Sequence, residues 1–143
     1  MVYKIRVILN TEEDVIRDIA IDASASLEDL HNAVTNSFGF TGEEMASFYR
    51  SDETWVQGEE HPLFDMGEGA DRKVQMSEVL LDQVLEKDND KMLYVYDFFN
   101  MWSFYVELIS ADFTPEEAAV PKLLCSLGAV PKNAPEIQFE SEV

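Results

Sequence analysis

The sequence has few residues of the kinds that build disulfide frameworks or metal centres. Its 143 residues include one cysteine, Cys125, and two histidines, His31 and His61. One cysteine excludes an internal disulfide framework, and no CxxC pair or second histidine is spaced to complete a zinc site. We expect His31 at the edge of the core and His61 in solvent. The prediction is therefore no metal site and no cofactor.

Long apolar runs are absent too. No stretch approaches the roughly 20 apolar residues that span a bilayer. The N-terminal segment MVYKIRVILN alternates like a strand and has no apolar core of a signal peptide. We expect a soluble cytoplasmic protein without membrane contact.

Basic residues are scarce, with 10 Lys and Arg against 29 Asp and Glu and a net charge of −19. Such a chain repels nucleic-acid phosphate and anionic lipid, which disfavours direct nucleic-acid binding and favours a basic partner protein. The sequence also lacks a P-loop glycine pattern and the G-x-S-x-G of a serine nucleophile. The oligomeric state is not indicated by any pattern.

Hydrophobic residues make up 46% of the chain, enough for a core at this length. Alternation predicts a hairpin from strands at 3–9 and 15–21. Residues 24–39 predict a helix, with Ser26 and Asp29 as a capping box and Gly39 at its end. Its core face carries apolar side chains at helical spacing: Leu27, Leu30, Val34 and Phe38.

Weaker patterns fill the rest of the chain. Residues 45–50 and 54–57 predict two short strands, and 58–73 predict an acidic loop. Residues 76–87 predict a helix with Val79, Leu80, Val84 and Leu85 as its apolar positions. The proline-containing segment from Asp112 onward predicts an extension packed on the same domain, with one helix over 116–128.

The stretch KMLYVYDFFNMWSFYVEL, residues 91–108, holds seven aromatic residues. It predicts two strands, 92–98 and 102–109, that are apolar on both faces, as in the centre of a covered sheet. Asn100 tolerates positive φ and suits the turn between them. The Asp97 carboxylate can accept hydrogen bonds from the backbone N–H groups of that turn.

The segments SLEDLHNAVTNSFGF, VQMSEVL and YVYDFFNMW together resemble the plasmid pRiA4b ORF-3-like family, from about Tyr3 to Leu108. Members are mostly of undetermined function, and some are passenger proteins of insertion elements. The resemblance implies an α+β fold, with a mixed sheet, a crossing helix and a β-grasp or ubiquitin-like core. It divides the chain into a domain at 1–111 and a C-terminal extension at 112–143.

Departures from the family pattern bear on catalysis. Where members commonly read Y-D-F-G-D-x-W-x-H, this chain has Phe99, Asn100 and Phe104 in place of the Gly, the second Asp and the His. The two histidines of an H-x-H-E-F pattern are replaced by Glu44 and Ala46. Only Asp97 and Trp102 carry over, which weakens an enzyme interpretation.

Three functions follow as hypotheses. The first is a protein-binding module without catalysis, whose candidate binding residues are Tyr96, Asp97, Trp102 and Tyr105. A second is a metal-assisted hydrolase that uses Asp97 with Glu44 or Glu107. The third is an acidic mimic of DNA that occupies a nucleic-acid-binding protein.

The acidic clusters do not point to a dedicated cation site. Asp65, Glu68 and Asp71 form one cluster, and Asp88 and Asp90 form another. Neither matches the ligand spacing of a calcium loop. Both are expected to be solvated.

Overall fold

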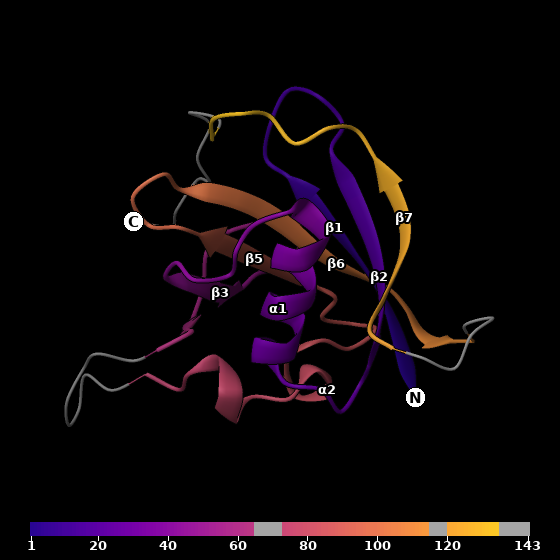
Figure 1. Ribbon diagram of the computed structural model, residues 1–143. Coiled ribbons are helices and arrows are strands. Elements are labelled where there is room, and N and C mark those ends of the chain that lie inside the picture. Colours follow the sequence, from indigo (N-terminus) through magenta and orange to yellow (C-terminus); the bar gives the residue numbers. More distant parts are fainter. Residues whose placement is uncertain (65–72, 115–119, 135–143) are drawn as a thin grey trace.

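The computed structural model describes residues 1–64, 73–114 and 120–134. They form a seven-stranded sheet in the order β4-β3-β5-β6-β1-β2-β7, with helix α1 across one face (Figure 1). The strands are β1 (Val2–Leu9), β2 (Ile16–Asp22), β3 (Ala46–Arg50), β4 (Glu60–Pro62), β5 (Lys91–Tyr96), β6 (Trp102–Phe113) and β7 (Lys122–Leu127). The helices are α1 (Leu27–Phe38) and the short α2 (Leu81–Val84).

Every strand pairing in the described residues is antiparallel. The α+β class is confirmed, but the expected mixed sheet is wrong. Parallel neighbours need a long crossover, whereas β1–β2 and β5–β6 are joined by short turns that force antiparallel pairing. A β-grasp core is not confirmed by this topology.

The predicted opening hairpin and α1 are confirmed. The Asp29 backbone N–H donates to Ser26 Oγ at 3.1 Å, and the Ser26 N–H donates to the Asp29 carboxylate at 3.0 Å. Gly39 ends the helix at φ 79°, in the left-handed region. The helix buries Leu27, Leu30, His31, Val34, Thr35 and Phe38.

The second strand of the 45–57 region lies further along the chain than predicted. Residues 54–57 do not form a strand, since Trp55 turns the chain at φ 59°. Gly58 then passes so close to β3 that an added Cβ would lie 2.8 Å from the Arg50 carbonyl oxygen. The partner of β3 is therefore β4, which lies inside the predicted 58–73 loop. His61 in β4 is 2% exposed, so its predicted solvation is wrong.

The predicted helix over 76–87 is two short pieces, a 3₁₀ turn at Met76–Glu78 and α2. The helix is interrupted because Leu80 forms an isolated bridge with Ser26, and the Leu81 N–H donates to the Ala25 carbonyl at 2.8 Å. Val79, Val84 and Leu85 are buried as expected, whereas Leu80 is 37% exposed.

In place of the helix predicted over 116–128, residues 122–127 form β7 beside β2. The N-terminal part of that prediction, 115–119, lies outside the described residues. Pro121 has no N–H to donate within a helix, and β2 offers an unpaired edge, so the strand satisfies more backbone groups. Strand β6 continues through Phe113, past the predicted boundary between residues 111 and 112. The division into a domain at 1–111 and an extension at 112–143 remains a prediction.

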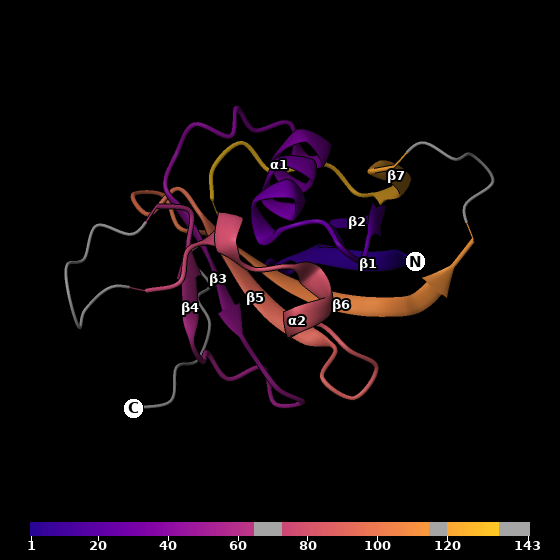
Figure 2. The same ribbon diagram turned by 90° about the horizontal axis from the view of Figure 1, so that it is seen from below.

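The main core lies between α1 and the sheet (Figure 2). Its largest fully buried side chains include Tyr94, Phe48 and Phe104. Five of the six β5 residues are buried, on both faces, which confirms the central position predicted for this strand. Within the described ranges no helix is long and apolar enough to cross a membrane.

Candidate functional site

The turn between β5 and β6, residues 97–101, holds two phenylalanines in solvent. Phe99 is 94% exposed and Phe98 is 42% exposed. Sequence analysis missed this, because the aromatic alternation of β5 continues to Phe98 and predicts a strand there. The strand ends at Tyr96, so Phe98 belongs to the turn instead.

Asp97 organises this turn, as the sequence predicts. Its carboxylate accepts hydrogen bonds from the Phe99 N–H at 3.1 Å, the Asn100 N–H at 3.4 Å and the Asn100 side-chain amide at 2.6 Å. The Asp97 N–H donates to the Met45 carbonyl at 2.8 Å, which ties the turn to β3. Asp97 and Met101, at φ 62° and 57°, take the positive φ that was predicted for Asn100.

Tyr96 and Trp102 anchor the base of the turn in the core. Both rings pack on Phe40, with centroid distances of 4.9 Å for Tyr96 and 5.0 Å for Trp102. The Tyr96 hydroxyl accepts the Gly42 N–H at 3.1 Å. Tyr96 is 3% exposed and Trp102 8% exposed, so these two predicted residues position the turn from beneath.

Tyr105, the fourth predicted residue, lies elsewhere. It pairs with Leu93, on the sheet face opposite the Tyr94 and Phe104 pair that packs in the main core. Its ring meets Trp55 edge to face at 4.9 Å, and the Lys91 ammonium lies 5.5 Å from the Trp55 ring centroid. The structure therefore groups Tyr96, Asp97 and Trp102 at one turn and separates Tyr105 from them.

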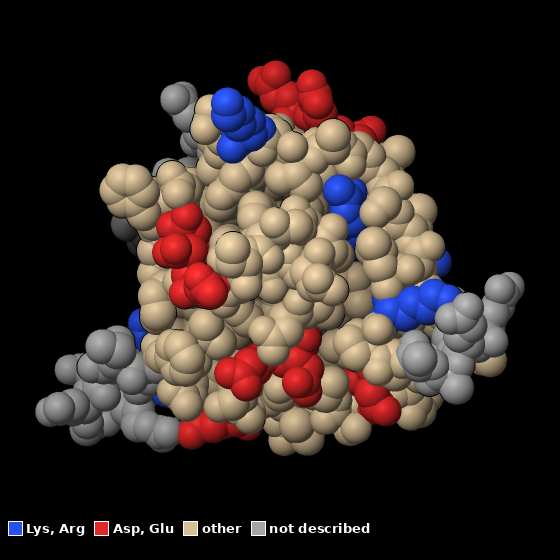
Figure 3. Space-filling view, viewed as in Figure 1, with Lys and Arg blue, Asp and Glu red and all other residues tan. Residues whose placement is uncertain are grey.

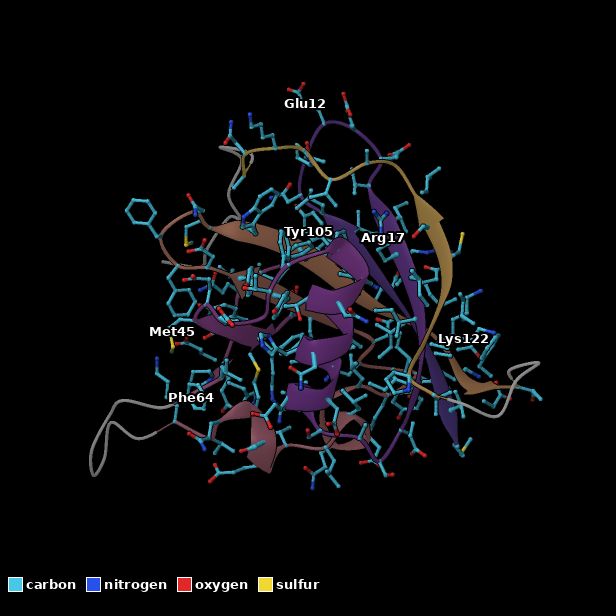
Figure 4. All side chains as sticks on the ribbon, in the orientation of Figure 1. Glu12, Arg17, Met45, Phe64, Tyr105 and Lys122 are labelled. Atoms are coloured by element: carbon cyan, nitrogen blue, oxygen red, sulfur yellow. The ribbon has the colours of Figure 1, made fainter. Side chains whose placement is uncertain are left out.

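Apolar and acidic side chains lie at the same end of the sheet as the turn. Met45 precedes β3, and Phe64, 55% exposed, follows β4, so the antiparallel register puts both at the sheet end that carries the turn. Figure 4 shows Met45 and Phe64 on the same side of the molecule. Glu43 and Glu44 are exposed beside Met45. The turn is thus an apolar projection with an acidic rim.

The histidines do not form a catalytic pair with the turn. His31 is buried with its Nδ1 2.6 Å from the Tyr94 hydroxyl, and burial lowers the pKa of His31. His61 donates from Nδ1 to the Val74 carbonyl at 2.8 Å, while its Nε2 lies 3.2 Å from a Glu59 carboxylate oxygen. Among the described residues, this buried Nε2 has no hydrogen-bond partner.

The carboxylates of the hydrolase hypothesis have separate structural environments. Asp97 is bound to its own turn, and Glu107 forms an ion pair with Lys91 at 3.1 Å. Glu44 is exposed. Over residues 1–64, 73–114 and 120–134, no three His, Cys, Asp or Glu side chains gather as metal ligands would. Asp65, Glu68 and Asp71 fall outside these ranges, so that predicted cluster stays untested.

Asp88 and Asp90 line an open hollow of about 560 Å³ together with Asp52 and Glu53. Lys87 and Lys91 line it as well, and Lys91 forms an ion pair with Asp90 at 3.0 Å. The two lysines offset part of the acidic charge. This mixed lining agrees with the sequence expectation of a solvated acidic loop.

Comparisons with known proteins address family and fold. No curated protein matches the chain. A crystal structure of a protein of unknown function, MM3350 from Methanosarcina mazei Go1, superposes with a TM-score of 0.76 at 20% identity, covering 92% of this chain and 72% of that one. At that identity the likeness concerns the fold alone. The family model of the plasmid pRiA4b ORF-3-like protein matches residues 1–136, well beyond the Leu108 limit of the sequence resemblance, so the chain belongs to that family.

Proposed function

We propose that this protein is an interaction module that inserts the Phe98–Phe99 turn into an apolar recess of a basic partner protein. The observation that carries the proposal is the 94% exposure of Phe99 on a turn fixed by the Asp97 carboxylate. Burying a phenylalanine side chain contributes roughly 1.5–3 kcal/mol. Because the turn is already ordered, little further conformational entropy is lost on binding.

Charge supports the choice of partner. Glu43 and Glu44 are exposed beside the turn, in a chain of net charge −19. Complementary charge around an apolar contact speeds association and selects against acidic proteins. The recess we propose is therefore apolar at its centre and lined at its rim with lysine or arginine.

The test is capture from nuclease-treated lysate of the natural host, followed by purification of the retained protein and calorimetric titration. Phe99→Ser removes the projecting ring at a site that contributes nothing to the core. Leu127→Ser is the matched control, since Leu127 is 52% exposed on β7. Loss of about 2 kcal/mol at a central contact weakens binding about 30-fold. A partner that binds both variants equally well contradicts the proposal.

The DNA-mimic hypothesis predicts a different result in the same experiment. Its partner would be a nucleic-acid-binding protein, and nucleic acid would compete with this chain for it. On the face shown in Figure 3, acidic side chains form separate groups around a largely uncharged centre. A mimic of the phosphate backbone would present a continuous acidic stripe, and the face in Figure 3 presents none.

A further inference from the structure

A groove runs between α1 and the start of β7, over the floor formed by β2. Its larger hollow is about 600 Å³, with Asn32, Ala33 and Asn36 on the α1 wall and Val120 and Pro121 on the other. A smaller hollow of about 150 Å³ continues it and shares Ala33, Asn36 and Pro121. The combined space lies in the range of pockets that hold small ligands or short peptide segments.

Two side-chain amides, those of Asn32 and Asn36, line this groove. Asn32 and Asn36 are exposed, and neither side chain forms a hydrogen bond within the residues that the structure describes. They are four residues apart on α1, about 6 Å along its axis. An extended chain repeats its outward main-chain groups every two residues, about 6.6 Å. Each amide offers one acceptor and two donor hydrogens, so the pair matches the N–H and C=O groups of an extended peptide.

The floor and the α1 wall of the groove carry small or buried side chains, which leaves room for a peptide backbone to approach closely. Ala25 and Ala33 are small and partly buried against the core, and Ile21 and Ile19 form apolar floor beneath them. The lining on α1 extends from Asp29 to Ser37, about 12 Å at the rise of a helix. That length accommodates roughly three or four extended residues.

The two ends of the groove carry side chains of opposite charge. Asp22 and Asp29 lie at the end nearest the start of α1, and Lys122 lines the smaller hollow. Two hydrogen bonds from Ser24 lower the pKa of Asp22, which favours its charged form. In Figure 4, Lys122 and Arg17 lie on the β7 side of α1. Among the described residues that line the groove, the Asp22–Asp29 end is the one that favours a cation.

We propose that the α1–β7 groove binds an extended peptide segment that carries a lysine or arginine side chain. Asn32 and Asn36 bind its main chain, and Asp22 and Asp29 bind the cation. The groove lies at β7, one edge of the sheet, whereas the Phe98–Phe99 turn projects from the end of the β5–β6 hairpin. The two surfaces are separate, so this proposal does not depend on the first.

The probe is an array of acetylated, amidated eight-residue peptides, half of them with one lysine or arginine, incubated with fluorescently labelled protein. The strongest binder is then titrated by fluorescence anisotropy. Asn32→Ala with Asn36→Ala removes both amides, and because alanine is a better helix former than asparagine the variant keeps α1. Ala33→Leu fills the groove. Asn133→Ala is the control, since Asn133 is exposed and lines neither hollow.

We expect the double alanine variant and Ala33→Leu each to weaken binding at least tenfold, with Asn133→Ala and Phe99→Ser within twofold of wild type. Replacing the peptide lysine with norleucine should weaken binding by a similar factor. The proposal is overturned if no peptide binds wild type, or if the double alanine variant binds the peptide as tightly as wild type does. It is also overturned if the norleucine peptide binds as tightly as the lysine peptide. Circular dichroism confirms that each variant is folded.

Discussion

The Nδ1 atom of His31 lies 2.6 Å from the Tyr94 hydroxyl, and this hydrogen bond joins α1 to β5 inside the core. His31 is 1% exposed and Tyr94 is 0% exposed. Burial lowers the pKa of His31 and raises the pKa of Tyr94 well above its usual value. Both groups are therefore neutral at pH 7, and the hydrogen bond pairs Nδ1 of His31 with the Tyr94 hydroxyl. The contact stabilises the fold and offers no proton donor to solvent.

This pair predicts a loss of stability in mild acid. The folded-state pKa of His31 is depressed, so the unfolded chain binds the proton more readily. The contribution is present above the unfolded pKa of about 6.5 and is lost as pH falls from there through the folded pKa. Urea unfolding at pH 7.5 and 5.5 should show a larger decline for wild type than for His31→Gln. An equal decline in both would place the effect on groups other than His31.

Removal of the Asp97 carboxylate should destabilise the β5–β6 turn. Asp97→Ala leaves the Phe99 and Asn100 N–H groups without their acceptor and adds strain at φ 62°. We expect a loss of about 1–3 kcal/mol in unfolding free energy and a lower melting temperature. Asp97→Asn retains an acceptor oxygen and the tolerance of left-handed φ, so it should lose less. Thermal unfolding, monitored by circular dichroism, should give melting temperatures that fall from wild type to Asp97→Asn to Asp97→Ala.

Local signals account for the elements that the sequence predicts correctly. The capping box and Gly39 define α1, alternation defines the first hairpin, and the position of Asp97 defines its turn. The errors lie where distant segments decide the structure. β7 forms because β2 offers an edge more than 100 residues earlier, as the Arg17 bond to Leu127, 110 residues apart, illustrates.

The residues of the candidate site also fall into two groups, those that a local motif identifies and those that it does not. Tyr96, Asp97 and Trp102 could be selected from their motif, and the structure places them together. The exposure of Phe98 and Phe99 could not be predicted, because composition alone does not distinguish a core phenylalanine from a projecting one. Tyr105 shares a strand with Trp102 but faces the other way, toward Trp55, whose positive φ has no sequence signal.

Two glycines with nearly equal φ should differ in their response to alanine. Gly39 has φ +79° and nothing within 4 Å of an added Cβ, so Gly39→Ala should cost only the left-handed strain of about 1–2 kcal/mol. Gly128 has φ +80°, and its added Cβ would lie 2.0 Å from the Asp14 carbonyl oxygen. Because backbone must move, Gly128→Ala should cost more. Urea unfolding of both variants checks this, and equal losses would contradict the close approach.

Arg17 should control how firmly β7 is held. Its Nε donates to the Ser37 carbonyl at 3.2 Å, and its Nη1 donates to the carbonyls of Ile16 at 2.9 Å and Leu127 at 3.0 Å. These bonds connect the end of α1 to β7, whose residues are all at least partly exposed. Side-chain packing therefore contributes little to holding β7, and we expect the guanidinium to be its main attachment beyond the pairing with β2.

Arg17→Met keeps an apolar stem against Phe38, whose ring lies 5.0 Å from the guanidinium carbon, but removes the donors. We expect amide hydrogen exchange in β7 to accelerate at least tenfold while β5 amides change little, because β7 would open locally without global unfolding. The overall loss should be about 1–3 kcal/mol. Arg50→Met in β3, beside the opposite edge strand β4, is the control. If β5 and β7 exchange accelerate together, Arg17 stabilises the whole fold and not the edge strand in particular.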